Sequence, residues 1–171
     1  MKYHKPILIL LAVFFSACDK PVKKLFWVEE NTPGRSDFIF LTESTNLAPL
    51  KVDSLKLFLR PYELEQFDSI STTYKNFGQI YHSDKFSAFV LLCSIDTHGR
   101  DYHFSIRTFN NDRKVIDDFE LGIWNETEHT YCFGSIDENL IIERTCDKKG
   151  TPDIMQITSE GKIMPLSHQP R

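Results

Sequence analysis

The sequence predicts a mainly β protein: a twisted antiparallel meander sheet of about six to eight strands, with a short N-terminal helical segment packed on one face. Short stretches with apolar residues at alternate positions are separated by clusters of turn-forming residues, which is typical of such a sheet. One stretch, residues 86–95, is apolar on both faces and needs cover on both sides. The helical segment is therefore placed on its second face. An α+β arrangement is the alternative.

The first half of the chain contributes two predicted strands and the helical segment. Residues 25–29 and 37–42 have strand character, and the turn-forming residues 31–34 separate them. In residues 47–67 apolar side chains recur at helical spacing, and Pro61 ends or redirects the helix because proline lacks the amide hydrogen. Residues 62–67 are a candidate for a second short helical turn. The apolar positions in this segment are Val52, Leu55, Phe58 and Leu59.

The second half of the chain predicts a meander. In residues 101–109 large apolar side chains alternate with polar ones, which indicates one buried and one wetter face. Tight turns rich in Gly, Asn and Asp join the strands, and a polar loop at residues 122–130 contains Trp124. The predicted strands are residues 86–95, 101–109, 115–119, 130–136, 140–145, 153–158 and 163–166.

Length and composition indicate one folded domain. The chain has 171 residues, of which 41% are hydrophobic and 13% aromatic, far from the composition of disordered chains. Its formal net charge is −4, and its Lys and Arg residues are scattered along the sequence. Nucleic acid binding needs a concentrated basic face, so nucleic acid is not expected as a partner.

The first eighteen residues have the organisation of an export signal. Lys2 and Lys5 form a basic start, residues 7–15 are apolar, and Ser16 and Ala17 precede Cys18. Nine apolar residues span about 14 Å as a helix, whereas the hydrocarbon core of a bilayer is about 30 Å thick. This segment is therefore predicted to be cleaved rather than to cross a membrane permanently.

The end of the apolar run, Phe15-Ser16-Ala17-Cys18, resembles the lipobox of bacterial lipoproteins, with Phe15 where Leu is usual. The resemblance implies acylation of the Cys18 thiol and cleavage before Cys18. It divides the chain into a signal peptide (1–17), a lipidated tether (18–24) and a single β-rich domain (25–171). The predicted location is the cell envelope, anchored by lipid to a bacterial membrane on its periplasmic face or at the cell surface. The domain itself resembles the small β-rich lipoproteins of bacterial envelopes, and this likeness implies no activity.

Three cysteines remain besides Cys18, so they cannot all pair within one molecule. Cys132 and Cys146 flank a predicted hairpin loop and are separated by an even number of positions, so both side chains can lie on one sheet face. Two interpretations stay open. A disulfide joins Cys132 and Cys146 if the register sets them opposite each other; otherwise all three are small buried hydrophobic residues.

No catalytic or metal-binding motif is present. The chain lacks the HxxxH and CxxC spacings that gather metal ligands, and it lacks the GxSxG turn of serine hydrolases. His98 and His103 lie on either side of one predicted turn, and Cys93 lies in the most apolar strand, where burial keeps a thiol protonated. No catalytic residue, metal or cofactor is therefore predicted.

Aromatic residues give the one positive indication of binding. Six aromatic residues exceed what a small core needs: Trp27, Phe77, Tyr81, Phe109, Trp124 and Tyr131. Aromatic side chains at a wet rim often contact sugars, peptides or proteins, and Trp27, Trp124 and Tyr131 are the candidate binding residues. The sequence thus predicts a membrane-anchored lipoprotein of the bacterial envelope with a non-enzymatic binding or assembly role, its partner an envelope protein or glycan. The alternatives are an inhibitor or immunity-type protein and a hydrolase whose site is assembled only in three dimensions.

Overall fold

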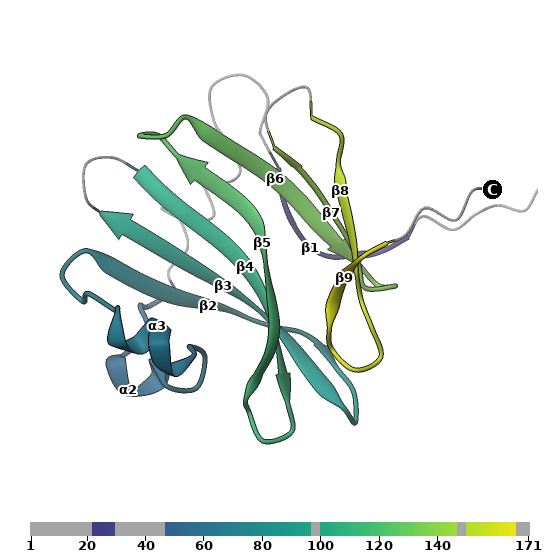
Figure 1. Cartoon of the computed structure of the whole chain (residues 1–171), viewed down its shortest axis with the longest axis horizontal. Coiled ribbons are helices and arrows are strands. Elements are labelled where there is room, and N and C mark those ends of the chain that lie inside the picture. Colours follow the sequence, from purple (N-terminus) through teal and green to yellow (C-terminus); the bar gives the residue numbers. More distant parts are fainter. Residues whose placement is uncertain (1–21, 30–46, 97–99, 147–149, 167–171) are drawn as a thin grey trace, which may run out of the picture.

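The computed structural model describes residues 22–29, 47–96, 100–146 and 150–166. Its strands form one antiparallel sheet that curves from β2 to β9 (Figure 1). The mainly β fold and the meander are confirmed. The elements are β1 (Lys24–Val28), α2 (Val52–Leu55), α3 (Pro61–Glu65), β2 (Thr72–His82), β3 (Phe86–Asp96), β4 (Arg100–Asn110), β5 (Val115–Asn125), β6 (Thr130–Asp137), β7 (Ile141–Cys146), β8 (Asp153–Ile157) and β9 (Ile163–Pro165).

Eight strands follow one another in sequence order across the sheet, and β1 is the exception because it pairs with β6. Only the first three residues of β6 pair with β5, up to the Ile123–Cys132 pair. Beyond that point β1 takes the place beside β6, and Trp27 of β1 lies opposite Ser135. The meander thus has eight strands, the upper end of the expected number, and β1 adds a ninth.

The sheet curls so that the β8–β9 turn contacts the end of β4 and the start of β5. The Thr108 hydroxyl donates a hydrogen bond to the Gly161 carbonyl oxygen at 2.7 Å, and the Ile163 amide donates to the Asp117 carboxylate at 3.0 Å. Gly161 has a φ of 79° and lies so close to Phe86 that a Cβ would stand 3.0 Å from that ring. Glycine is thus the residue that both this backbone conformation and this close approach require.

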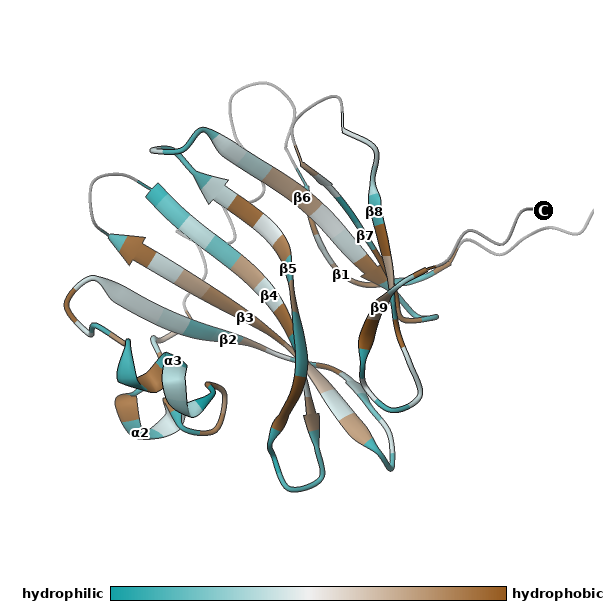
Figure 2. Ribbon diagram, viewed as in Figure 1, coloured by the Kyte–Doolittle hydropathy of each residue, from teal (hydrophilic) through white to brown (hydrophobic). Residues whose placement is uncertain are grey.

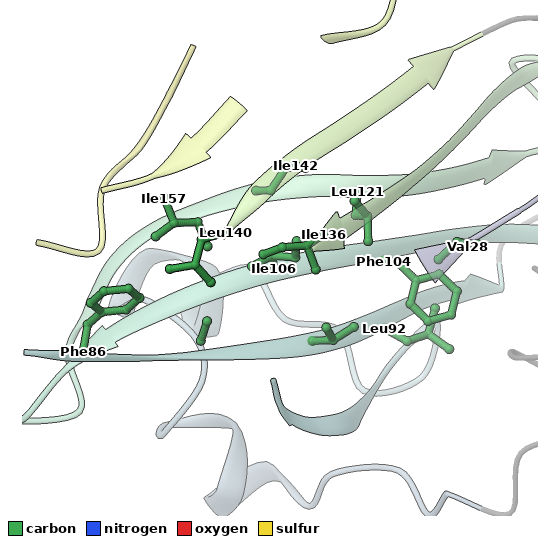
Figure 3. Close-up of a cluster of buried hydrophobic side chains, with 12 residues drawn as sticks. Val28, Phe86, Leu92, Phe104, Ile106, Leu121, Ile136, Leu140, Ile142 and Ile157 are labelled. Carbon is green, nitrogen blue, oxygen red and sulfur yellow. The ribbon is translucent and has the colours of Figure 1, made fainter. Parts of the chain in front are cut away.

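The core lies on the concave face of the curled sheet. Its side chains come from strands at both ends of the sheet and meet in the space between them (Figure 3). Along β3 and β4 the alternate positions contribute to it, and banding of apolar and polar residues follows β4 in Figure 2. The core residues are Val28, Phe86, Ala88, Val90, Leu92, Phe104, Ile106, Leu121, Ile136, Leu140, Ile142 and Ile157.

The convex face of β3 and β4 is covered by the segment that contains α2 and α3, which lies beside β2 and β3 in Figure 1. Leu55 and Leu59 of this segment are buried, as is Leu91 of β3. The prediction that the apolar second face of residues 86–95 needs cover agrees with this arrangement. The helical segment forms two helices of four and five residues, and the second begins at Pro61, the residue expected to end or redirect the first.

Two strands differ from the sequence-based expectation: β2 was not predicted, and β5 is longer than predicted. Strand β2 was missed because Gly78 and two register shifts break its alternation of apolar and polar side chains. Strand β5 runs to Asn125 rather than ending at residue 119, so Trp124 belongs to a strand and pairs with Tyr131. The strand predicted over residues 37–42 lies outside the described residues.

Candidate functional site

A pocket of about 440 Å³ lies on the convex face, between the helical segment and the sheet. Three elements of the meander, β2, β3 and β4, supply one side, and the residues just after α2 supply the other. The turn that follows β4 closes one end. The lining residues are Leu57, Phe58, Gln79, His82, Ser87, Phe89, Phe109, Asn110, Asn111 and Arg113.

Three phenylalanine rings form an apolar cluster within this lining. The centroid of the Phe58 ring is 5.8 Å from that of Phe89 and 6.0 Å from that of Phe109, and Phe89 and Phe109 are 5.5 Å apart. All three pairs are edge to face, with interplanar angles of 76° to 90°. This packing fixes the rings against one another, so the apolar side of the pocket is formed before any ligand arrives.

The strand register explains how the sheet residues come together. Ser87 and Phe89 lie two positions apart on β3, so both point to the convex face while Phe86, Ala88 and Val90 point into the core. Across the ladders Gln79 faces Phe89, and His82 faces Ser87, which in turn faces Phe109.

A buried ion pair fixes Phe58 over the sheet. The guanidinium of Arg107 donates one hydrogen bond to the Phe58 carbonyl oxygen at 2.8 Å and two to the Glu63 carboxylate at 2.5 and 2.9 Å. Burial raises the pKa of Glu63, but the hydrogen bonds from Arg107 and from the Arg60 amide outweigh it and leave the pKa lowered. The carboxylate is thus charged at neutral pH and holds the helical segment to β4.

Polar side chains line the rim. Nδ1 of His82 lies 2.9 Å from the Ser87 hydroxyl oxygen. The side-chain amide nitrogen of Asn111 donates a hydrogen bond to the backbone carbonyl oxygen of Asp84 at 2.8 Å. The turn after β4 is held by its own hydrogen bonds. The backbone carbonyl oxygen of Asn110 accepts from the Arg113 backbone amide, and the side-chain oxygen of Asn110 accepts from the Lys114 backbone amide. Arg113 is therefore presented by an ordered turn, with a φ of 60°.

A second polar cluster lies on the same face of β4, outside the pocket lining. His103 is held between two acids, with Nδ1 3.1 Å from Glu120 and Nε2 2.8 Å from Asp101. Glu120 and Asp101 raise the pKa of His103 against the opposing effect of burial, and the hydrogen bond from His103 lowers the pKa of Glu120. The contact thus favours the charged forms of both His103 and Glu120, and the cluster ties β4 to β5.

We expect this cluster to make stability depend on pH. The pKa of His103 is higher in the folded chain than the ordinary value of about 6.5, so its contribution is complete below that value and is lost as the pH rises through the folded pKa. The urea midpoint of the wild-type chain should therefore fall as the pH rises above about 6.5. His103→Gln should flatten this fall, whereas the exposed His129→Gln should leave it unchanged. An equal fall in the His103→Gln variant would contradict the assignment.

Cys93 lies opposite both Tyr74 and His103 in the strand register. Burial raises the pKa of its thiol to about 11, in spite of a hydrogen bond with Tyr74 that acts the other way. The same burial raises the pKa of Tyr74. The thiol therefore stays protonated at neutral pH and does not act as a nucleophile there.

Of the aromatic residues that the sequence singled out for binding, Phe109 lines the pocket, whereas Trp27, Trp124 and Tyr131 lie elsewhere. Trp124 and Tyr131 pack edge to face across β5 and β6 with centroids 4.8 Å apart, and Trp27 is 47% exposed on β1. None of the three lines the pocket. Cys132 and Cys146 lie opposite each other on β6 and β7 and form a disulfide. Cys18 and His98 lie outside the described residues.

Sequence reasoning missed the site that the fold assembles. Phe109 was among the aromatic residues predicted for binding, but Phe58 and Phe89 were assigned only to the helical segment and to the strand over residues 86–95, and the turn at residues 110–113 was treated only as a connection. The one usable signal was the apolar second face of residues 86–95, since a strand that needs cover implies a seam where the cover meets the sheet. Among the residues described, no group of three or more His, Cys, Asp or Glu is placed to hold a metal ion.

Comparisons with protein-family models, with curated proteins and with solved structures gave no match to this chain.

Proposed function

We propose that this chain is a lipid-anchored protein of the bacterial cell envelope whose β domain binds a small ligand in the pocket on its convex face. The role is one of binding rather than catalysis. The ligand is free in the envelope or forms the end of an envelope protein or glycan. The membrane is the second partner, reached through the acylated Cys18.

One observation carries the binding proposal: the preformed pocket of about 440 Å³, with three packed phenylalanine rings on one side and polar side chains at the rim. Small-molecule sites in proteins are concave, mostly apolar and provided with a few polar groups that fix orientation. The volume lies within the range of about 300–1,000 Å³ usual for such sites.

The anchoring proposal rests on the first eighteen residues of the sequence. A basic start, a short apolar run and two small residues have the organisation of an export signal, and the cysteine that follows them resembles that of a lipoprotein signal. Among the helices that the structure describes, none combines the length and the apolar character needed to span a bilayer.

A hydrolase is the second candidate, because the Ser87 hydroxyl lies beside the His82 imidazole at the pocket rim. A serine nucleophile needs a base that is itself oriented by a third group. Within the described ranges no such group contacts His82, so this pair fits a polar rim better than a catalytic dyad. The inhibitor alternative has no specific observation in its favour.

Blocking the pocket tests the binding proposal. Gln79 is exposed and lines the pocket, so Gln79→Trp should fill part of it at little cost to stability. The matched control is Thr73→Trp, which is exposed on the same strand but outside the lining. Ligand-observed NMR with the mature protein in nanodiscs should show a set of small aromatic compounds binding to wild type and Thr73→Trp, but not to Gln79→Trp. Binding that survives Gln79→Trp would place the ligand elsewhere.

Mass spectrometry tests the anchor. The mature protein isolated from bacterial membranes should begin at Cys18 and carry the mass of its acyl chains. Cys18→Ser should remove the acyl mass and release the domain from the membrane fraction, while Cys93→Ser should change neither. A mature N-terminus at any other residue would refute the anchoring proposal.

A further inference from the structure

The charges around the pocket indicate which ligands it accepts. The two lining side chains that can carry charge, Arg113 and His82, are both basic. No Asp or Glu lines the pocket, although the chain as a whole has 24 acidic residues against 20 Lys and Arg. The pocket lining thus lacks acidic residues, although such residues outnumber Lys and Arg in the chain. Asp84 and Asp112 neighbour lining residues in sequence, but neither belongs to the lining.

Both basic groups have capacity left for a ligand. None of the ion pairs among the described residues includes Arg113. In contrast, the buried Arg107 near the same pocket is neutralised by Glu63. His82 uses Nδ1 toward Ser87, so Nε2 is left for a ligand. Nε2 is a donor in the tautomer that accepts the Ser87 hydroxyl hydrogen at Nδ1.

We infer that the ligand is a small amphipathic carboxylate, an anion with an apolar ring or chain. Its apolar part packs on Phe58, Phe89 and Phe109, and its carboxylate lies at the rim, against the guanidinium of Arg113 and within reach of His82. A guanidinium matches a carboxylate with two parallel hydrogen bonds, so Arg113 sets the specificity of the site. This inference rests on the proposed binding function.

A pair of ligands that differ only in charge tests the inference. 3-Phenylpropionate carries a carboxylate, and 3-phenylpropionamide is its neutral counterpart of nearly the same shape. Dissociation constants for both are measured by ligand-observed NMR on the mature protein in nanodiscs, with empty nanodiscs as the baseline for partitioning into lipid. The acid should bind roughly tenfold or more tightly than the amide, as expected for a hydrogen-bonded charge pair.

Variants assign the preference to Arg113. Asparagine tolerates a positive φ, so Arg113→Asn removes the charge without straining the turn. It should bring the two dissociation constants to the same value, and Arg113→Lys should restore part of the difference. Lys114→Gln removes the same charge one position away, outside the lining, and should leave the preference intact.

The outcomes separate the two proposals. If acid and amide bind equally well and Gln79→Trp abolishes both, the pocket binds ligands but the charge inference is wrong. If the preference for the acid persists in Arg113→Asn, the specificity assigned to Arg113 is wrong. If neither compound binds in any variant, the proposed binding function fails, and this inference fails with it.

Discussion

Arg107→Met should lower the free energy of unfolding by about 3–5 kcal/mol. Arg107 is 6% exposed, and its guanidinium holds both the Glu63 carboxylate and the Phe58 carbonyl oxygen. Removal of the guanidinium leaves a charged carboxylate beside the sheet with no cation to balance it. The helical segment should then detach from β4. Urea unfolding followed by far-UV circular dichroism measures the loss.

A second substitution distinguishes the ion pair from simple loss of packing. Glu63→Gln keeps an oxygen that can accept the hydrogen bond from the Arg60 amide but removes the charge. The double variant Arg107→Met/Glu63→Gln should therefore be more stable than Arg107→Met alone. Lys24→Met, which breaks the exposed pair with Glu29, should cost at most about 1 kcal/mol. A double variant less stable than Arg107→Met would mean that the uncompensated charge is not the cause.

Arg107→Met should also abolish ligand binding at temperatures where the sheet remains folded. Phe58 and Leu57 reach the pocket only because the helical segment is held to the sheet, and Arg107 contacts the Phe58 backbone directly. Loss of that contact opens one wall of the pocket. The ion pair thus links stability of the helical segment to the integrity of the site.

Removal of the Cys132–Cys146 disulfide should lower the free energy of unfolding by about 3 kcal/mol. The bond closes a loop with a sequence separation of 14, and cross-linking a loop of about 15 residues is expected to stabilise a chain by that amount through the unfolded state. The comparison is Cys132→Ala/Cys146→Ala against wild type in urea without reductant. Added reductant should destabilise wild type and leave the double variant unchanged.

Cys93→Ala is the matched control, since it deletes a partly buried thiol that takes no part in a disulfide. It should cost less than the double variant and should not alter the response to reductant. Equal sensitivity to reductant in wild type and the Cys132→Ala/Cys146→Ala variant would show that the disulfide does not contribute to stability. The hairpin of β6 and β7 would then be held by its hydrogen bonds and its core contacts alone.

Local pattern was sufficient for most of the sheet. Phe104 and Ile106 alternate with polar residues, and their predicted burial is confirmed because alternation in a strand maps directly onto two faces. Strand β2 lacked such a pattern, since Gly78 and the adjacent register shifts interrupt it. The segment after residue 47 has helical spacing, but spacing alone does not predict how long its helices are. Pro61 and the packing of the segment on β3 set their lengths.

The sequence by itself determined the class of the fold and the order of most strands, because these depend on residues close together in the chain. The export signal stays a prediction from the sequence. The tertiary structure alone decided the pocket. Leu57, Phe89 and Arg113 come from three separate segments and meet only when the sheet is formed and the helical segment is docked. Long-range contacts also decided that Arg107 is neutralised and Arg113 is not, since Glu63, the partner of Arg107, is 44 positions away in the sequence. Which groups meet across such distances is set by register and curvature, and these follow from the packing of the whole sheet.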